Sequence, residues 1–387
     1  MAKLGEVCTI VSGSTPKTSV TSYWDGNIKW ITPAELNEDT FYIMDSVRHI
    51  TEEGKEKTGL SYLPTGTVIL SSRAPIGKTA IAGCEMCCNQ GFKNLICSDA
   101  IYNEYLYFFL KSKTDYLNSL GRGATFKEIS KSIVESIEIP LPEVNQQKEI
   151  AEKFKKLEQL ISLRKQQLAN LDELVKARFV EMFGDPADNV NNLPASPMTA
   201  ICQIIDGDRG KNYPKQEEFS DSGFCLFLNA KNVTAQGFSF ENCTYITEEK
   251  DALLRNGKLC RGDVVLTTRG TIGNLAFYDT SVPYENIRIN SGMVILRMNK
   301  QVVSEIFFIE QFKMQLDSIK SRIASGSAQP QLPISTMNKI EMILPPIELQ
   351  NQFAAFVERV SQQKQTVQQS LEKLELMKKA LMQEYFG

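Results

Sequence analysis

The chain has 387 residues, 42% of them hydrophobic and 23% charged, with a formal net charge of −3. This is the composition of a globular protein with apolar material for roughly two or three domain cores. No run of about 18 apolar residues occurs, and the first residues do not resemble a signal peptide, so we expect a cytoplasmic protein without a membrane span. A chain that binds DNA by itself often carries a basic excess, and this chain has none.

The first part of the chain predicts several short strands and one short helix. β-branched apolar runs follow glycine turn signals at TVILSS (67–72), AIAG (80–83) and KNLICS (93–98). Apolar residues at three- and four-residue spacing predict a helix over Asn103–Ser112. The same kinds of pattern return later as DVVLTT (263–268), GMVILRM (292–298) and a helix over 304–321.

Nine cysteines are scattered along the chain, and we interpret them as reduced core residues. The tightest cluster is Cys84, Cys87 and Cys88. A structural zinc site needs four ligands, the single histidine His49 is distant in sequence, and no second Cys-x-x-Cys occurs. We therefore expect no bound metal.

The hydrophobic period changes after Pro142 and again after Pro345. From there a heptad pattern continues for almost five heptads in each case, which predicts two helices of about 40 residues and about 60 Å. Both helices end at a Phe-Gly pair, and their apolar stripes have no other long partner in the chain. The short polar linker from Asp185 to Pro197 leads into a second globular segment, from which the second helix returns, so we expect the helices to pack antiparallel. The apolar stripes are Ile150, Phe154, Leu157, Ile161, Leu168, Leu171, Val175 and Met182, and Phe353, Val357, Val360, Val367, Leu371, Leu374, Leu381 and Tyr385.

Four cationic residues interrupt these stripes: Arg164, Arg178, Lys364 and Lys378. Their long stems can lie over apolar surface while the charges reach water. The alternative is that they set the register of the two helices.

The chain is an internal repeat. Residues 66–83 align with 262–279 at an offset of 196, and the ends, including Gln147 with Gln350, align at 203. Near the start we align Leu4 with Ile201 at an offset of 197, and WITPAEL (30–36) with LFLNAKN (226–232). The prediction is an α+β protein with a pseudo-two-fold repeat: globular segments at 1–143 and 185–346, and long helices at 144–184 and 347–387, which form an antiparallel coiled coil.

Catalytic signatures are missing from the sequence. It contains no Walker loop, no Gly-x-Gly-x-x-Gly after a strand, and no nucleophile elbow near the single histidine. We find no Asp/Asn-Pro-Pro-aromatic motif of amino-methyltransferases and no convincing cluster of nuclease carboxylates. The sequence therefore predicts a protein that does not catalyse a reaction by itself.

Basic and small polar residues recur in the predicted turns of both segments. Hydroxyls, backbone amides, lysine and arginine are common phosphate ligands, and Arg, Asn and Gln also bind base edges. Arg73 and Arg269 occupy matching turns, so they are the strongest candidates. The candidate DNA-binding residues are Ser12, Ser14, Thr15, Lys17, Arg73, Lys78, Gln90, Lys93, Arg122, Lys127, Lys131, Arg209, Lys211, Lys231, Asn232, Arg269, Asn274, Asn290, Ser291 and Arg322.

On these residues the chain resembles the specificity subunits of type I restriction-modification enzymes. The resemblance covers nearly the whole chain, although the second segment has 206–211 where the first has the Gly-Ser-Thr-Pro loop. The segments that carry it are Gly13–Pro16, SSRAPIGK (71–78), NQGFKNLI (89–96), GRGATFKEIS (121–130), IEIPLPEVNQQKEIAEKF (137–154) and ILPPIELQNQF (343–353).

The resemblance implies two target recognition domains that read the two parts of a bipartite double-stranded DNA site. The long helices would be spacers that set the unread gap. Two methyltransferase subunits and restriction subunits that translocate DNA would be the partners. S-adenosylmethionine, ATP and Mg would belong to those partners, with no cofactor bound by this chain.

Two other classes of protein stay open at this point. One is an independent, two-headed DNA-binding regulator without catalytic partners. The other is a bifunctional enzyme with a hidden catalytic site, which methylation or cleavage by the purified chain alone would reveal.

Overall fold

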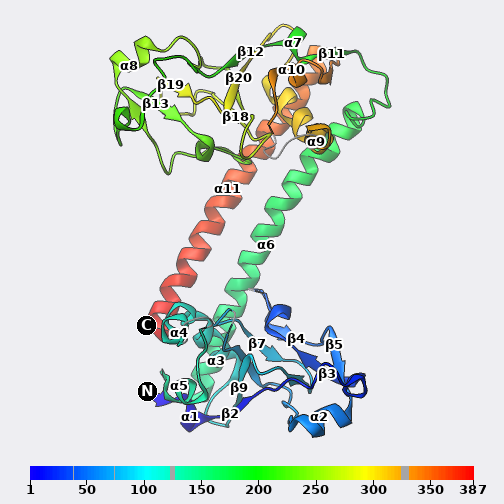
Figure 1. Ribbon diagram of the computed structural model, residues 1–387, viewed down its shortest axis with the longest axis vertical. Coiled ribbons are helices and arrows are strands. Elements are labelled where there is room, and N and C mark those ends of the chain that lie inside the picture. The colour runs from blue at the N-terminus through cyan, green and yellow to red at the C-terminus, as the bar shows by residue number, and fades with distance from the viewer. Residues whose placement is uncertain (38, 74, 123–126, 324–330) are drawn as a thin grey trace. The chain divides into compact units, whose positions relative to one another are not determined.

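The computed structural model describes residues 1–37, 39–73, 75–122, 127–323 and 331–387 (Figure 1). They form two compact units: unit 1 is Met1–Gln166 with Gln368–Gly387, and unit 2 is Gln167–Val367. The division falls inside the two 40-residue helices, α6 (Val144–Phe183) and α11 (Ile347–Phe386). Each unit therefore holds one globular segment and one end of both long helices.

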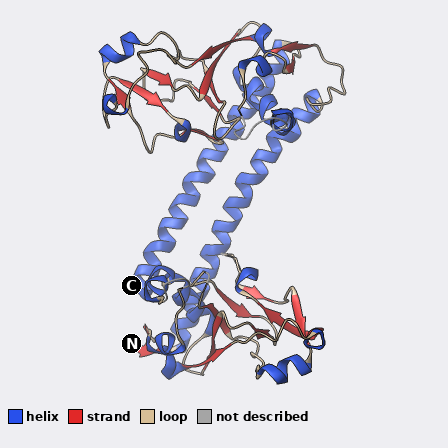
Figure 2. Ribbon diagram, viewed as in Figure 1, coloured by secondary structure: helices blue, strands red, loops and turns tan. Residues whose placement is uncertain are grey.

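Unit 1 mixes strands and short helices, as the predicted α+β class requires (Figure 2). A five-stranded sheet has the order β2-β9-β6-β7-β4, a three-stranded sheet has the order β5-β3-β8, and β1 pairs with β10. The elements are β1 (Ala2–Lys3), α1 (Leu4–Val7), β2 (Cys8–Ser12), η1 (Thr21–Tyr23), β3 (Trp24–Ile31), η2 (Pro33–Glu35), β4 (Tyr42–Ile43), β5 (Arg48–Ile50), α2 (Glu52–Thr58), β6 (Val68–Ser71), β7 (Thr79–Ala82), β8 (Cys87–Cys88), β9 (Phe92–Cys97), α3 (Asn103–Ser112), α4 (Thr114–Leu120), α5 (Lys131–Ser136) and β10 (Glu138–Ile139).

Unit 2 repeats this plan. Its four-stranded sheet has the order β12-β20-β17-β18, its three-stranded sheet has the order β16-β13-β19, and β11 pairs with β21. The elements are β11 (Ala195–Pro197), α7 (Met198–Ile201), β12 (Cys202–Asp206), η3 (Gln216–Glu218), β13 (Cys225–Leu228), η4 (Ala230–Asn232), β14 (Val233–Thr234), β15 (Gly237–Phe238), β16 (Tyr245–Ile246), α8 (Glu248–Leu253), β17 (Val264–Thr267), β18 (Leu275–Phe277), β19 (Ile287–Ile289), β20 (Met293–Met298), α9 (Glu305–Ile323), α10 (Ile334–Met337) and β21 (Glu341–Ile343).

Strand pairing corrects two parts of the repeat alignment. α1 and α7 each lead directly into a strand that begins with cysteine, so Leu4 corresponds to Met198 rather than Ile201. Apolar residues recur every three positions in this segment, and a slip of three therefore preserved the hydrophobic pattern. Likewise, the carbonyls of Ile31 and Leu228 accept equivalent backbone bonds, which shifts the WITPAEL alignment by one residue.

Matching glycines shape the turns after β6 and β17. Gly77 and Gly273 have φ of 99° and 94°, a left-handed region that other residues rarely adopt. A Cβ at Gly77 would lie 2.9 Å from Thr114 Cγ2, and one at Gly273 would lie 2.2 Å from Leu316 Cδ1. Both backbone angle and close packing thus explain why glycine occurs at both positions.

Aromatic side chains join each globular segment to the long helices. In unit 1, Phe108 of α3 stacks on Phe154 of α6, and Phe154 stacks on Phe386 of α11. In unit 2, Phe179 of α6 stacks on Phe307 of α9. All five rings are fully buried, and burial of one such side chain contributes about 1.5–3 kcal/mol of transfer free energy. The ends of both long helices are therefore part of the core of each unit.

Two of the cations in the heptad stripes make ion pairs between the helices within their own unit. Lys378 Nζ lies 2.7 Å from Glu158 Oε1 in unit 1, and Lys364 pairs with Asp172 in unit 2. Arg178 instead pairs with Glu181 of its own helix, and its guanidinium lies 6.0 Å from the ring centroid of Phe356. For the two lysines, these contacts favour a role in register.

Candidate nucleic-acid interface

Three loops meet at one end of the five-stranded sheet of unit 1. The loop Gly13–Lys17 follows β2, the turn Asn89–Gly91 precedes β9, and Arg73 follows β6. The amide of Ser14 donates to the Cys88 carbonyl at 3.0 Å. A Cβ on Gly13 would lie 2.0 Å from the Asn89 carbonyl oxygen, so this contact requires glycine.

A fourth segment joins this end of the sheet. Ser72 donates its amide to the Gly91 carbonyl at 2.7 Å and accepts from the amide of Ile129 at 3.0 Å. The backbones of Arg73 and Glu128 form an isolated β-bridge. The four loops that the sequence singled out in the first segment therefore lie together.

Unit 2 brings the matching loops together in the same way. Thr268 donates its amide to the Gly292 carbonyl at 2.9 Å and accepts from Leu332 at 2.9 Å. A Cβ on Gly207 would lie 2.3 Å from the Asn290 carbonyl oxygen, just as a Cβ on Gly13 would approach the Asn89 carbonyl oxygen. The structure thus contains one loop arrangement twice, and its side chains differ between the copies.

Most of the candidate residues at these loops present side chains to solvent. Arginine, lysine and hydroxyl groups there are donors for phosphate oxygens, and the arginine fork also fits a guanine edge. The exposed candidates are Ser12, Lys17, Gln90, Arg122, Lys127, Lys131, Arg209, Lys211, Lys231 and Arg269, and the half-buried ones are Ser14, Thr15, Arg73, Lys78, Asn274, Asn290 and Ser291.

Contacts within the loops orient several of these side chains. Thr15 Oγ1 donates to Gln90 Oε1, which leaves the amide group of Gln90 available as a donor. Arg209 Nη2 donates to the Ser291 carbonyl at 3.2 Å and pairs with Asp206. Asn290 Oδ1 accepts from the Gly292 amide at 2.9 Å, so this side chain shapes the turn.

Two candidates are corrected because the structure buries them. Asn232 is 1% exposed, and its carboxamide donates to the carbonyls of Ser239 and Asn242 and accepts from Asn229. Lys93 is 7% exposed and lies 3.2 Å from Glu128 Oε1. Asn232 satisfies its polar groups inside the protein, and the buried Lys93 is held by Glu128, so neither side chain is presented at the surface.

Lys78 and Asn274 make hydrogen bonds within the protein that compete with the predicted DNA contacts. Lys78 Nζ donates to the carbonyls of Pro33 and Leu36 at the two ends of η2. At the matching position, Asn274 Nδ2 donates to the carbonyl of Val233 directly after η4. These partners are about 40 residues away in sequence, which explains why the sequence pattern did not reveal them.

The loop 206–211 is organised by a buried carboxylate, Asp208. It is 7% exposed, and its oxygens accept from the amides of Gly210 at 2.7 Å and Arg255 at 2.8 Å. Burial raises the pKa of Asp208, but hydrogen bonds from the backbone of Gly210, Arg255 and Asn256 outweigh it, and the pKa lies below its ordinary value. The Asp208 carboxylate therefore holds the loop, while the side chains of Arg209 and Lys211 stay on the surface.

Two exposed arginines at these loops were missed by the sequence interpretation. Arg255 is held beside the 206–211 loop through Asp208. Arg48 lies over the ring of Trp24 at 3.6 Å, and the neighbouring Trp30 donates to the Ser14 carbonyl. Neither arginine is part of a repeated motif, and only the packing around it reveals its position.

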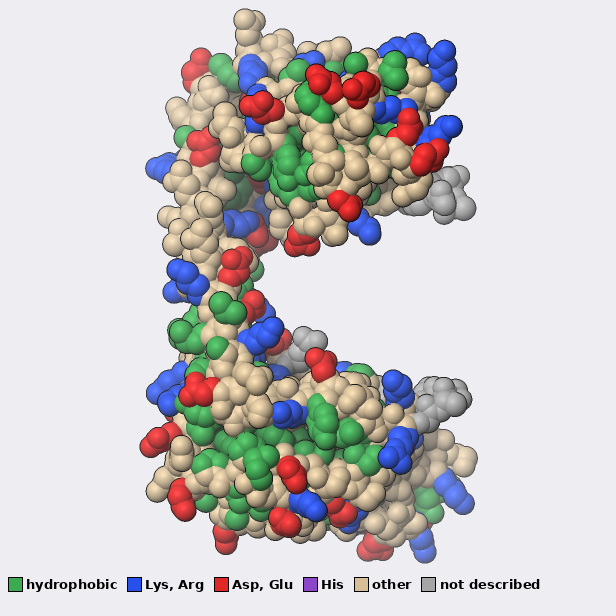
Figure 3. Space-filling model, turned by 90° about the vertical axis from the view of Figure 1, so that its left-hand side faces the viewer, with side chains coloured by type: hydrophobic (Ala, Val, Ile, Leu, Met, Phe, Trp, Pro, Cys, Tyr) green, Lys and Arg blue, Asp and Glu red, His purple; other side chains and the backbone are tan. Residues whose placement is uncertain are grey.

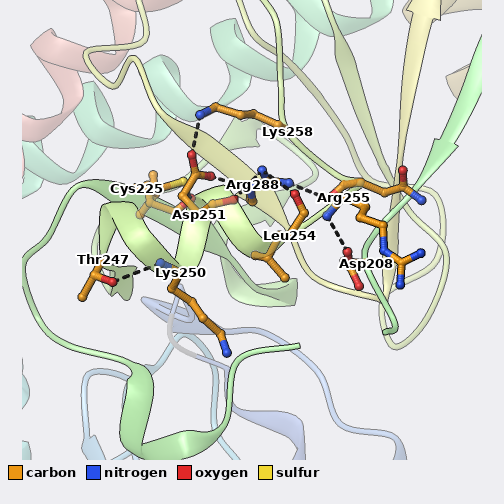
Figure 4. A network of polar contacts seen from close by, with 11 residues as sticks. Asp208, Cys225, Thr247, Lys250, Asp251, Leu254, Arg255, Lys258 and Arg288 are labelled. Atoms are coloured by element: carbon orange, nitrogen blue, oxygen red, sulfur yellow. Dashed lines mark hydrogen bonds and ion pairs between the residues drawn. The ribbon is translucent and has the colours of Figure 1, made fainter. Parts of the chain in front are cut away.

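A buried ion pair joins α8 to β19, the strand that precedes Ser291 in sequence (Figure 4). Arg288 of β19 and Asp251 of α8 are 5% and 4% exposed and pair directly. Arg288 also donates to the carbonyls of Asn256 and Leu254 at 2.7 and 3.1 Å. Burial raises the pKa of Asp251, and hydrogen bonds from Lys258 and Arg288 lower it to a net value below the ordinary one.

Cys87 and Cys88 of the cysteine cluster lie in β8 (Cys87–Cys88). They are neighbours in β8, so their side chains point to opposite faces of the strand and enter different hydrophobic clusters. Burial raises the pKa of Cys87 to about 11 and of Cys88 to about 12, which keeps both as thiols.

Some predictions fall outside the described residues. These are the segments 123–126 and 324–330 of the third pair of loops and the side chain of Arg322. Within the part of the chain that the structure describes, no helix is long and apolar enough to cross a membrane. Figure 3 shows one face of the molecule, on which basic and acidic side chains are interspersed over both units.

The structure thus presents the same loop arrangement twice on one α+β scaffold, with hydrogen-bond donors exposed in each copy. The family described as type I restriction modification DNA specificity domain matches residues 1–173 and 198–376. The chain belongs to this family. Its members recognise DNA sequences and leave catalysis to partner subunits, so the chain is not itself an enzyme.

Individual relatives agree with the family. The type I restriction enzyme MjaIX specificity subunit of Methanocaldococcus jannaschii is 29% identical, with 92% of this chain and 85% of the relative covered. The EcoR124I/EcoR124II specificity subunit of Escherichia coli is 26% identical over 41% of this chain and 40% of its own length. The solved S subunit of a type I system from M. genitalium has the same fold, with a TM-score of 0.57 at 17% identity, 100% of this chain and 95% of that one covered.

Proposed function

We propose that the chain reads a bipartite double-stranded DNA site, with one half-site for each globular segment. Residues 1–143 and 185–346 are then the two target recognition domains. The observation that carries this proposal is the duplicated loop arrangement with different side chains at matching places. Gln90 in the first copy corresponds to Ser291 in the second, and Thr15 corresponds to Arg209. Thr15 contacts the Gln90 side chain, and Arg209 contacts the Ser291 carbonyl.

The long helices, residues 144–184 and 347–387, are proposed to form one antiparallel coiled coil that sets the length of the unread gap. The heptad pattern supports this, and so do the ion pairs of Lys378 with Glu158 and Lys364 with Asp172. Helices of 40 residues are about 60 Å long. If they are tilted relative to the DNA, two recognition domains can contact half-sites about one helical turn of DNA apart.

The partners proposed for this chain are two methyltransferase subunits and restriction subunits that translocate DNA. Those partners use S-adenosylmethionine, ATP and Mg, and the assembly acts in the cytoplasm. A net charge of −3 and the mixed charges of Figure 3 support a shared task, because partners that also enclose the DNA supply part of the electrostatic attraction.

Mapping methylated adenines tests this proposal. DNA from cells that carry the chain and its methyltransferase partner should be methylated at one two-part sequence with a fixed gap. Replacing residues 1–143 with the matching domain of a relative should change one half of that sequence and leave the other unchanged. A change in both halves, or methylation by the purified chain alone, would contradict the proposal.

A further inference from the structure

One buried glutamine lies at the start of each long helix. Gln147 and Gln350 are each the fourth residue of their helix, and both are 0% exposed. A fully buried carboxamide is stable only when its oxygen and its two N–H groups find partners. The structure provides these partners at both sites.

The two glutamines make the same three hydrogen bonds. Gln147 Oε1 accepts from the Tyr102 amide at 2.8 Å, and its Nε2 donates to the carbonyls of Ala100 at 3.0 Å and Pro142 at 2.8 Å.

Gln350 repeats this set within unit 2. Its Oε1 accepts from the Ser304 amide at 3.0 Å, and its Nε2 donates to the carbonyls of Val302 at 3.1 Å and Pro345 at 2.8 Å. We call each set of three bonds a glutamine clamp. The two clamps have the same donors and acceptors at matching positions, although the sequences of the globular segments around them have diverged.

Each clamp joins the long helix to the strand that carries a candidate reading turn. β9 runs from the turn at Gln90 to Cys97, and the chain then reaches Ala100 and Tyr102, which the first clamp holds. β20 runs in the same way from the turn at Ser291 to the segment held by the second clamp. A strand of six residues spans about 20 Å and is stiff within its sheet. A rotation at the clamp therefore moves the reading turn.

We propose that Gln147 and Gln350 are positioning residues that fix the angle of each recognition domain on its helix and thereby restrict the permitted gap between the half-sites. This proposal rests on the proposed function. One additional base pair in the gap rotates one half-site relative to the other by about 35° and moves it by about 3.4 Å. A rigid clamp excludes that geometry, and a loosened clamp accepts it. The bases read within each half-site stay the same.

The test uses the full chain assembled with its methyltransferase partner and duplexes that carry both mapped half-sites. The gap is the native one, or it is longer or shorter by one base pair. The variants are Gln147→Met, Gln350→Met and the double variant, because methionine fills a similar volume without hydrogen bonds. The ratio of methylation rates on native and altered gaps should fall by at least about fivefold in each single variant, because one net hydrogen bond is worth about that factor and methionine removes all three. It should fall further in the double variant.

A matched control separates positioning from general destabilisation. Thr67 is 1% exposed, and its hydroxyl donates to the Pro64 carbonyl at 2.7 Å within the globular segment. Thr67→Val should lower the midpoint of thermal unfolding and leave the gap ratio unchanged. If Gln147→Met does not fold, the gap ratio is measured for Gln147→Asn instead. It should also fall, because the shorter amide cannot reach all three partners.

The outcomes separate the two proposals. If folded glutamine variants keep the wild-type gap ratio, the clamp proposal is wrong while the bipartite reading stands. The clamp proposal is also wrong if the recognised bases change. If the wild-type assembly methylates no two-part site, the proposed function itself fails.

Discussion

Arg73 and Arg269 lie at matching positions, two residues beyond the ends of β6 and β17. Their backbones form β-bridges with Glu128 and Gln331, so the backbone of each arginine is fixed. The side chain of Arg269 is exposed, and that of Arg73 is half-buried. Anchoring reduces the entropy that an arginine loses when it binds. These two residues should therefore contribute more to DNA affinity than lysines on free loops.

Substitution of Arg269 tests its contact with DNA. Arg269→Ala should weaken binding of the assembled complex to its site by about 1–3 kcal/mol, measured by titration at several salt concentrations. A phosphate contact would also reduce the salt slope by about one, whereas a base contact would relax specificity at one position. Lys57→Ala, at an exposed site on α2, is the control. Unchanged affinity of the Arg269 variant would exclude the contact.

The buried pair of Asp251 and Arg288 predicts a pH-dependent stability of unit 2. Asp251→Asn leaves Arg288 buried without its counter-charge and should lower the free energy of unfolding by about 3–5 kcal/mol at neutral pH. The pKa of Asp251 is lowered from its ordinary value of 3.8, so its contribution is present above that pH and is lost as the pH falls further. Urea unfolding should show a constant difference between wild type and variant from pH 7 to pH 5, and a smaller one below about pH 4. The exposed Asp221→Asn is the control, and a difference that does not depend on pH would contradict the assignment.

At the scale of elements, strands β2 and β9 place two cysteines opposite each other. Cys8 pairs with Cys97 in the antiparallel register, and the Ser98 amide donates to the Val7 carbonyl at 2.9 Å. That bond makes Cys8 and Cys97 a non-hydrogen-bonded pair, in which side chains are closest and a disulfide can fit. A hydrogen bond between the Cys8 and Cys97 side chains that favours the protonated form of Cys8, together with burial, raises the pKa of Cys8 well above its usual range.

This pair should form a disulfide when the protein is treated with a disulfide oxidant such as oxidised glutathione. Both thiols lose their protons, the new S–S bond forms, and the oxidant is reduced to two thiols. Mass spectrometry should show a loss of about 2 Da, and peptide mapping should find Cys8 joined to Cys97. Cys8→Ser should abolish the product, whereas Cys202→Ser should not, because Met298 lies opposite Cys202. Mixed disulfides at other cysteines as the only products would contradict the prediction.

The elements with a strong local period were predictable from the sequence. β6, β17 and α3 lie within a residue of the predicted runs, because a buried strand or an amphipathic helix imposes its period on its own residues. The roles of Lys78 and Asn232 were not predictable, because Lys78 donates to carbonyls of η2 and Asn232 donates to the carbonyls of Ser239 and Asn242 beyond its own turn. A lysine that binds carbonyls and a lysine that binds phosphates look alike in sequence, and only burial and contacts separate them.

At the scale of the whole molecule, the length of the helices should determine the gap between half-sites. Removing residues 165–171 and 368–374 deletes one heptad from each helix between the two lysine ion pairs. The helices then shorten by about 10 Å, and the gap in the methylated site should shrink by about 3 base pairs. Deleting only one of the two heptads breaks the register and should abolish methylation. An unchanged gap after the paired deletion would show that the helices do not act as spacers.

The repeat was visible in the sequence because its matching parts carry out the same structural task. The Arg-Gly turns, the buried glutamines and the ends of the helices keep their residues because the backbone geometry or the packing demands them. The alignment failed at the start of the second copy and was one residue out at 30–36, and in both places mainly apolar character is shared. Arg48 and Arg255 were missed for the related reason that each is unique to one copy.

Unit 1 is built from two chain segments that are far apart in sequence, which affects how the protein folds during synthesis. Its core includes Phe386, with Leu381, Met382 and Tyr385 packed against it, yet unit 2 lies between these residues and the rest of unit 1. A ribosome therefore completes the contiguous unit 2 before it supplies the last helical turns of unit 1. The usual order of co-translational folding, with the N-terminal unit first, should be reversed. Until then, Tyr105 and Phe154 of nascent unit 1 lack the ring of Phe386 that packs against both of them in the folded protein.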